Sequence, residues 1–321
     1  MKTIKKKKLS IGVSDFKKLI INNLYFVDKS LFIKDVVDDM EVLLYPRPRR
    51  FGKTLNLSML KYFYDCSEDN SHLFNDLAIS KEEDIMEKQG KYPVIYLTFK
   101  DVKNRSKEKT FVKIYRLISE LYNDVAYLLD SAFITKNEIE YFENIQYGKA
   151  IASDYENSLK FLAKLLYNHH KVNPVILIDE YDTPIHAGYT HDYYDEIIEF
   201  MRDFLSSGLK DNTYLEKAVI TGILRVSQES IFTGLNNIRV YSMLSPKSND
   251  KFGFTNDEVE EMLHYYESSL DFETVKKHYN GYNFFGIDIY NPWSILSSVC
   301  DNMIGFYWLN TSSNTLIKTM C

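Results

Sequence analysis

The stretch "EVLLYPRPRRFGKTLNLSML", residues 41–60, contains a strand, a loop and a helix in close succession. Its first residues have the composition of a buried parallel strand, and its last residues repeat apolar side chains at helical spacing. The loop between them ends in Gly52, Lys53 and Thr54, which fill the last three places of the phosphate-binding signature G-x-x-x-x-G-K-[ST]. Strand, loop and helix in this order favour phosphate binding, because the free amides and positive dipole of a helix N-terminus attract anions.

The loop departs from the signature at Arg47, which stands where the first glycine is expected, between Pro46 and Pro48. The loop tolerates this if the chain turns there without a positive φ, and the prolines would hold it rigid. We therefore predict that this loop binds ATP with Mg²⁺. We also predict that the loop lies on the surface, so that replacing Lys53 removes no core volume. The predicted nucleotide-binding residues are Arg49, Arg50, Phe51, Gly52, Lys53, Thr54 and Leu55.

A second motif, "PVILIDE" at residues 174–180, consists of four branched aliphatic residues followed by Asp179 and Glu180. This is the form of a Walker B strand, and acids at the carboxyl edge of a parallel strand face the ligand-binding crevice. We expect Asp179 to hold Mg²⁺ together with Thr54, and Glu180 to polarise the attacking water as a catalytic residue. The alternative is a buried strand that ends in a solvated acidic turn.

A third segment, "KAVITGILR" at residues 217–225, carries a polar Thr221 within an apolar strand and Arg225 just beyond it. The hydroxyl could sense a γ-phosphate, and an arginine supplied by the same chain could stabilise the transferred phosphoryl group. Thr221 and Arg225 are therefore candidate catalytic residues. The alternative is that Thr221 is an ordinary β-branched strand residue and Arg225 an ordinary surface charge.

The order of elements predicts an α/β fold, a three-layer P-loop NTPase sandwich with a mainly parallel sheet. Further strands are expected at 92–99 and 238–244, and amphipathic helices at 55–65 and 155–170. We place one domain at 1–245 and a small helical or winged-helix-like region at 246–321. In that region we expect a helix capped by Thr255 and Glu258, a hairpin turning at Asn280-Gly281, and a helix that begins after Asn291.

Composition narrows the functional classes. The 321 residues include 45% hydrophobic and 26% charged side chains, enough for a full core, and a net charge of -6 argues against a globally basic nucleic-acid binder. No apolar run approaches the roughly 18 residues of a membrane span, so we expect a cytoplasmic protein without a membrane partner. The three cysteines, Cys66, Cys300 and Cys321, lack the spacing of a zinc site or a disulfide framework.

The blocks "YFVDKSLFIKDV", "PRPRRFGKTLNLSMLKYFY", "LIDEYDTPI", "TGILRVSQESIFTGLNNIRVYSML", "KFGFTNDEV" and "HYNGYNFFGIDIYNPWSIL" span nearly the whole chain. Together they resemble the bacterial predicted AAA-ATPase-like family, in which the "RPRRFGKT" loop is the family's own variant. The resemblance implies an ATPase core of the additional-strand class, with Lys53 and Thr54 on phosphate and Mg²⁺ and Asp179 and Glu180 as the Walker B pair. It also matches Arg225 to a sensor arginine.

Similar proteins usually continue into a PD-(D/E)XK nuclease-like domain, whereas this chain ends at "WLNTSSNTLIKTMC". We expect either a natural short form or a chain truncated before that domain, and in both cases no nuclease activity. Three functions stay open: an ATPase, a nucleotide-gated switch that moves its C-terminal region, and a DNA-associated module of a mobile element or defence system. The expected small ligands are ATP and ADP. A nucleic acid or a protein client, and an oligomeric state, are open alternatives.

Overall fold

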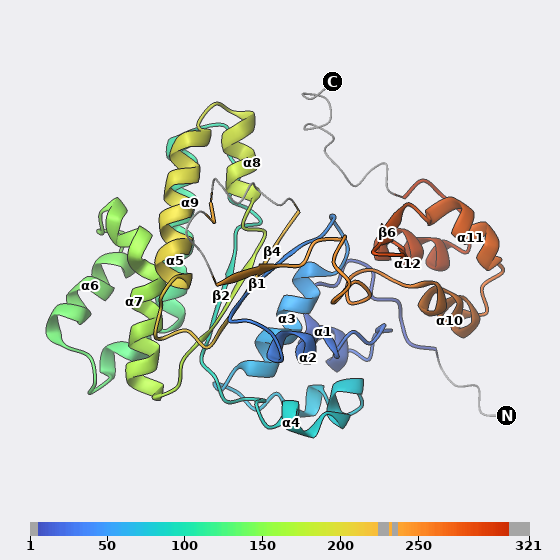
Figure 1. Ribbon diagram of the computed structural model, residues 1–321, viewed down its shortest axis with the longest axis horizontal. Helices are drawn as coiled ribbons and strands as arrows, with labels where there is room; N and C mark the ends of the chain where they lie inside the picture. Colours follow the sequence, from blue (N-terminus) through green and yellow to red (C-terminus); the bar gives the residue numbers. More distant parts are fainter. Residues whose placement is uncertain (1–5, 224–230, 233–236, 308–321) are drawn as a thin grey trace.

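The computed structural model describes residues 6–223, 231–232 and 237–307. Its centre is a five-stranded sheet in which every neighbouring pair is parallel, in the order β2-β3-β4-β1-β5 (Figure 1). The strands are β1 (Val42–Pro46), β2 (Val94–Thr98), β3 (Val175–Asp179), β4 (Lys217–Gly222) and β5 (Ile238–Val240).

Helices cover both faces of this sheet, which gives the predicted three layers (Figure 1). On one side lie α1 (Phe16–Ile21), α2 (Phe32–Val37), α3 (Lys53–Tyr64) and α4 (Glu83–Met86). On the other lie α5 (Lys107–Asp124), α6 (Lys136–Gln146), α7 (Ala152–His170), α8 (Thr183–Thr190) and α9 (Tyr194–Leu209).

The two hydrophobic cores follow from strand periodicity, because successive side chains of a strand point to opposite faces. In β1, Val42 and Leu44 join the core beneath α5 to α9, whereas Leu43 and Tyr45 join the core beneath α1 to α4. All five residues of β1 and of β3 are buried, as expected for central parallel strands. The carboxyl ends of these strands therefore open at one edge, held by packing on both sides.

The residues after 245 form a smaller unit that lies to one side of the sheet (Figure 1). It consists of α10 (Asn256–Tyr266), α11 (Phe272–Tyr279), the antiparallel pair β6 (Tyr282–Phe284) and β7 (Ile287–Ile289), and α12 (Pro292–Asp301). Its hydrophobic cluster also receives Leu9, Ile11, Tyr25 and Val27 from the start of the chain. The described N-terminal residues thus help to hold this C-terminal region.

The predicted fold class and the five strands are confirmed. In the C-terminal region, the capping box of Thr255 and Glu258 and the N-cap of Asn291 are also present. The predicted hairpin turn at Asn280-Gly281 is wrong: Asn280 is the C-cap of α11, and the hairpin turns at Phe285-Gly286. Phe285 and Gly286 both have positive φ, 47° and 88°, as a tight two-residue hairpin turn requires.

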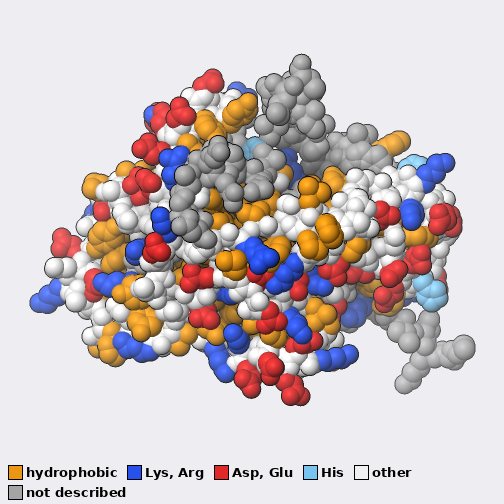
Figure 2. All heavy atoms as spheres, in the orientation of Figure 1, with side chains coloured by type: hydrophobic (Ala, Val, Ile, Leu, Met, Phe, Trp, Pro, Cys, Tyr) orange, Lys and Arg blue, Asp and Glu red, His pale blue; other side chains and the backbone are white. Residues whose placement is uncertain are grey.

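Figure 2 shows acidic and basic side chains interspersed over one face of the molecule, in keeping with the modest net charge. Among the described residues, no helix combines the length and the apolar character needed to cross a membrane.

Candidate nucleotide-binding site

The loop between β1 and α3 is shaped by two residues with positive φ, Arg50 at 68° and Gly52 at 81°. Helix α3 begins directly after Gly52, so its first amides open toward the loop. The ammonium of Lys53 donates to the carbonyl oxygens of Arg47 at 3.0 Å and Pro48 at 2.9 Å. The lysine side chain thus folds back on its own loop. A bound phosphate could take the place of these carbonyls as the hydrogen-bond partner of the ammonium.

The prediction that Lys53 lies on a surface loop, where replacement removes no core volume, is wrong. Its residue surface is only 6% exposed, and burial lowers the pKa of its ammonium below the usual range of lysine, an effect that the nearby charge of Asp179 opposes. A buried cation whose partners are neutral carbonyls is poorly compensated. An anionic ligand would compensate it.

Arg47, in the place of the first signature glycine, is fully buried and supports the loop from behind. Its guanidinium donates to the carbonyls of Pro46, Tyr241 and Ser248, and lies 4.9 Å from the ring centre of Phe252. Its backbone amide donates to Gly222 of β4 at 3.0 Å. Arg47 therefore replaces the flexibility of a glycine with a side chain that fixes the loop to β4 and to the segment after β5.

Asp179, at the end of β3, is fully buried and receives two hydroxyl groups. Thr54 of α3 donates to its Oδ2 at 2.6 Å, and Thr221 of β4 donates to its Oδ1 at 2.5 Å. This arrangement depends on β4 lying between β1 and β3, which brings Thr221 beside Asp179. The predicted metal residues Thr54 and Asp179 are thus adjacent, and the Thr221 hydroxyl is engaged by the carboxylate.

Glu180 follows Asp179 with a φ of 52°, a left-handed conformation that is costly for a residue with a Cβ. Its carboxylate accepts from the hydroxyl of Thr183 at 3.3 Å. Burial, and secondarily the charge of Asp179, raises its pKa above the usual range of glutamate. Strained backbone and a perturbed carboxylate together are typical of functional positions.

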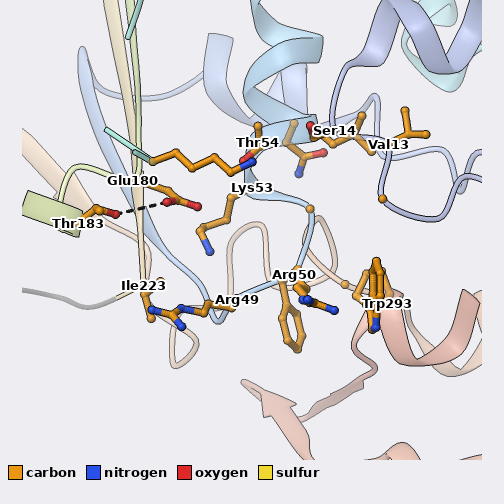
Figure 3. A pocket seen from close by; sticks show the side chains of 18 of the residues that line it. Val13, Ser14, Arg49, Arg50, Lys53, Thr54, Glu180, Thr183, Ile223 and Trp293 are labelled. Carbon is orange, nitrogen blue, oxygen red and sulfur yellow. Dashed lines mark hydrogen bonds between the residues drawn. The ribbon is translucent and has the colours of Figure 1, made fainter. Parts of the chain in front are cut away.

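These groups meet in one cavity of about 1280 Å³. In Figure 3 Thr54 lies above Lys53 and Glu180, and Arg49 and Ile223 lie below them. All the predicted nucleotide-binding residues from Arg49 to Leu55 line this cavity, together with Glu180. Asp179 and Thr221 lie behind its wall, and Thr54 connects them to it.

The C-terminal region closes one side of the cavity through α12. Trp293 lines the cavity, and its indole lies beside Arg50, whose guanidinium carbon is 4.0 Å from a ring centre (Figure 3). Arg50 Nη1 is buried without a hydrogen-bond partner among the described residues. The side chain of Phe51 is fully buried and packs on Tyr282 and Phe284 of the hairpin.

At Gly253 the chain passes between the phosphate-binding loop and strand β7, and a side chain there would collide with both. A Cβ there would lie 2.9 Å from Phe51 and 2.4 Å from Ile289, and the φ of 84° is itself left-handed. The amide of Gly253 donates to the carbonyl of Phe51 at 3.2 Å. Only glycine allows this approach of the phosphate-binding loop to the C-terminal region.

The structure also shows the contacts of Asp28 and Lys29, to which sequence patterns assign no role. Asp28 accepts from the amides of Ser30 and Ala78, and Lys29, largely buried, pairs with Glu258 of α10 at 2.5 Å. These contacts join positions up to 229 apart in the sequence, for which no local pattern exists. Arg225, the candidate sensor arginine, lies outside the described residues.

The strand order, the loop at the start of α3 and the acids Asp179 and Glu180 at the end of β3 define the class as an α/β protein with a P-loop NTPase-like fold. The sequence pattern of the family described as "Predicted AAA-ATPase" matches residues 10–232, and the chain belongs to this AAA-ATPase-like family. Family membership supports an ATPase-like, nucleotide-binding function. It confirms the resemblance drawn from the sequence blocks.

The chain is also similar to an uncharacterized protein from the vnfD 5′ region of Azotobacter chroococcum mcd 1. The two are 29% identical over 320 residues, which cover 97% of this chain and 55% of that relative. The chain therefore spans about half the length of the curated relative that it matches.

Proposed function

We propose that this protein binds ATP together with Mg²⁺ in the cavity beside α3 and hydrolyses it. The observation that carries the proposal is the 2.6 Å contact between the Thr54 hydroxyl and the buried carboxylate of Asp179, with Glu180 in the same cavity. Hydroxyl and carboxylate oxygens suit Mg²⁺, which proteins usually hold through one or two carboxylates plus phosphate oxygens. In the described parts of the chain, no group of three or more His, Cys, Asp or Glu could hold a metal alone.

Each residue then has a separate task. Lys53 exchanges its carbonyl partners for phosphate oxygens, and Glu180 orients the attacking water and accepts its proton. Thr221 holds the Asp179 carboxylate in position beside Thr54. Bound Mg²⁺ would neutralise developing charge on the phosphates. Arg225 stays a predicted source of further positive charge.

Steady-state phosphate release tests the proposal. Glu180→Gln should bind ATP with unchanged affinity but lose turnover, because the amide keeps the shape and loses the base. Glu140→Gln, an exposed acid on α6, is the matched control and should behave as wild type. Equal turnover by the Glu180 variant and wild type would exclude Glu180 as the catalytic base.

A nucleotide-gated switch is the second candidate, favoured by the contacts between the loop and the C-terminal region. Phe51 packs in the hairpin, Arg50 lies on Trp293, and Asn291 donates to the Arg49 carbonyl at 3.4 Å. A ligand that moves the loop must therefore disturb α12 or the hairpin. Tight nucleotide binding without phosphate release, with changed hydrogen exchange in α12, would favour the switch over the ATPase.

A further inference from the structure

The cavity has a second basic segment in its lining, besides the phosphate-binding loop. This segment, "KDVKNRSKEK", residues 100–109, runs from the end of β2 into α5 and contains five cations and two acids. Lys100, Lys103, Arg105 and Lys109 line the cavity, with Asn104 and Ser106 between them. Neither Asp101 nor Glu108 lines it. We call the four cations the basic wall.

The side chains of the basic wall differ from those of two neighbouring lysines on α5, Lys107 and Lys113. Lys107 pairs with Glu196 at 2.9 Å, and Lys113 donates to the carbonyl of Asp101 at 2.9 Å. For the side chains of the basic wall, the described residues provide neither an ion pair nor a hydrogen bond. All four residues are exposed. Four cations on one wall, without partners in the part of the chain that the structure describes, create a local positive potential in a protein of net charge -6.

The cavity also offers more room than a nucleotide at the loop needs. Ligand pockets usually measure about 300–1,000 Å³, and this cavity has about 1280 Å³. Beside the basic wall its lining continues along α8 with Thr183, His186, Thr190 and His191. Imidazole rings can stack on unpaired bases.

We propose that this half of the cavity binds a single-stranded nucleic acid, whose phosphates contact the basic wall while its bases lie toward α8. Positive grooves that follow the backbone, combined with rings for stacking, are the usual means of binding single strands without strong sequence preference. This site is separate from the phosphate-binding loop and does not require that ATP be hydrolysed.

The chemistry of the wall favours nucleic acid over an acidic protein partner. Protein interfaces usually carry aromatic or other apolar anchors at their centre. In the segment 100–109 the apolar residue Val102 is buried, at 4% exposure, and the residues that line the cavity are cationic or polar. Such a surface offers hydrogen-bond donors to phosphate oxygens and little apolar contact area.

Fluorescence polarisation with a labelled single-stranded DNA of about 20 nucleotides, across 50–200 mM salt, tests the proposal. Four phosphate contacts predict a salt slope of log K near -3, since each contact on a single strand contributes about -0.7. Lys103→Ala combined with Arg105→Ala should reduce the magnitude of this slope by about 1.4. The matched control, Lys160→Ala combined with Arg116→Ala, removes one lysine and one arginine that are exposed outside the cavity and should keep the wild-type slope.

A parallel titration with ATP separates this site from the nucleotide site. ATP affinity should be the same in the Lys103 and Arg105 variant as in wild type, whether or not the protein hydrolyses ATP. Three results would overturn the proposal: no DNA binding at 50 mM salt, equal losses in variant and control, or weaker ATP binding in the variant. Tighter binding of a labelled polyglutamate than of DNA would assign the wall to an acidic protein instead.

Discussion

The guanidinium carbon of Arg50 lies 4.0 Å from a ring centre of Trp293, so a residue of the phosphate-binding loop rests on the first turn of α12. A cation over an indole face contributes about 0.5–2 kcal/mol, depending on how far it is desolvated. This contact is one of several that join the loop to the C-terminal region. It also places a fluorophore beside the candidate nucleotide site.

Trp293 fluorescence should therefore report nucleotide binding. The chain has two tryptophans, and Trp308→Phe leaves Trp293 as the sole one. In that background ATP with Mg²⁺ should change the emission intensity or wavelength, because a ligand at the loop displaces Arg50 from the indole. Adding Arg50→Ala should remove most of the change while the protein stays folded. An identical nucleotide response with and without Arg50 would show that the two residues are not coupled.

Restoring the signature glycine at position 47 should destabilise the protein. Arg47→Gly empties a fully buried site and leaves the carbonyls of Tyr241 and Ser248 without their donor. We expect a loss of about 3 kcal/mol or more in the free energy of unfolding, measured by urea denaturation. Arg47→Met fills much of the volume without donors and should recover part of this loss. Unchanged stability in Arg47→Gly would mean that the loop does not depend on this side chain.

Lys53→Met should abolish ATP binding without lowering the melting temperature of the ligand-free protein. The folded-state pKa of Lys53 is depressed, so the charged form opposes folding at neutral pH, and that cost disappears only as pH rises above the folded pKa. The neutral side chain removes the cost and keeps the volume. Saturating ATP at about 100 times the Kd should stabilise wild type by about 2.7 kcal/mol and the variant not at all. An equal thermal shift in both proteins would contradict the assignment.

The pH dependence of turnover should reveal the raised pKa of Glu180. Its raised folded-state pKa means that the carboxylate becomes protonated, and turnover falls, at a higher pH than for an ordinary glutamate near 4.3. The same shift means that ionised Glu180 reduces stability above its folded pKa, and that stability increases as pH falls through that value toward the unfolded one. Glu180→Gln should therefore melt at a higher temperature than wild type at pH 7.5. A higher melting temperature for wild type would contradict the sign of this shift.

The backbone of Glu180 allows a further test, independent of charge. A left-handed conformation costs a residue with a Cβ about 1–2 kcal/mol relative to glycine. Glu180→Gly should therefore be more stable than Glu180→Ala by about 1 kcal/mol in denaturant unfolding, although both lack the carboxylate. If alanine were equally stable at this position, the φ of 52° would not represent strain.

Local patterns predict the sheet and the loop well, because buried strands and helix N-termini have short-range signals. The runs at 42–46 and 175–178 are continuous apolar stretches, and Thr255 with Glu258, three residues apart, marks a helix start. The hairpin prediction failed because Asn280-Gly281 carries the usual turn signal, yet Asn280 ends α11. The turn instead uses Phe285, which sequence preferences disfavour at positive φ.

The contacts that surround the site could not be predicted, because they join distant segments. Arg47 contacts Tyr241, Arg50 contacts Trp293, and Lys29 pairs with Glu258. Each pair depends on tertiary packing and leaves no periodic trace in the chain. The burial of Lys53 could not be predicted for the same reason. The carbonyls that it contacts are close in sequence, whereas the segments that cover it are distant in sequence.

The strand order β2-β3-β4-β1-β5 has a consequence for synthesis on the ribosome. Among the strands of the described residues, β1, which leads into the phosphate-binding loop, pairs with β4 and β5, and β4 begins at Lys217. At about 5–20 residues/s, β1 waits roughly 10–30 s for its first strand partner to be made. During that interval a fully apolar parallel strand has both edges unpaired, which exposes the nascent chain to aggregation. Its capture by chaperones is therefore expected before residues 217–222 emerge.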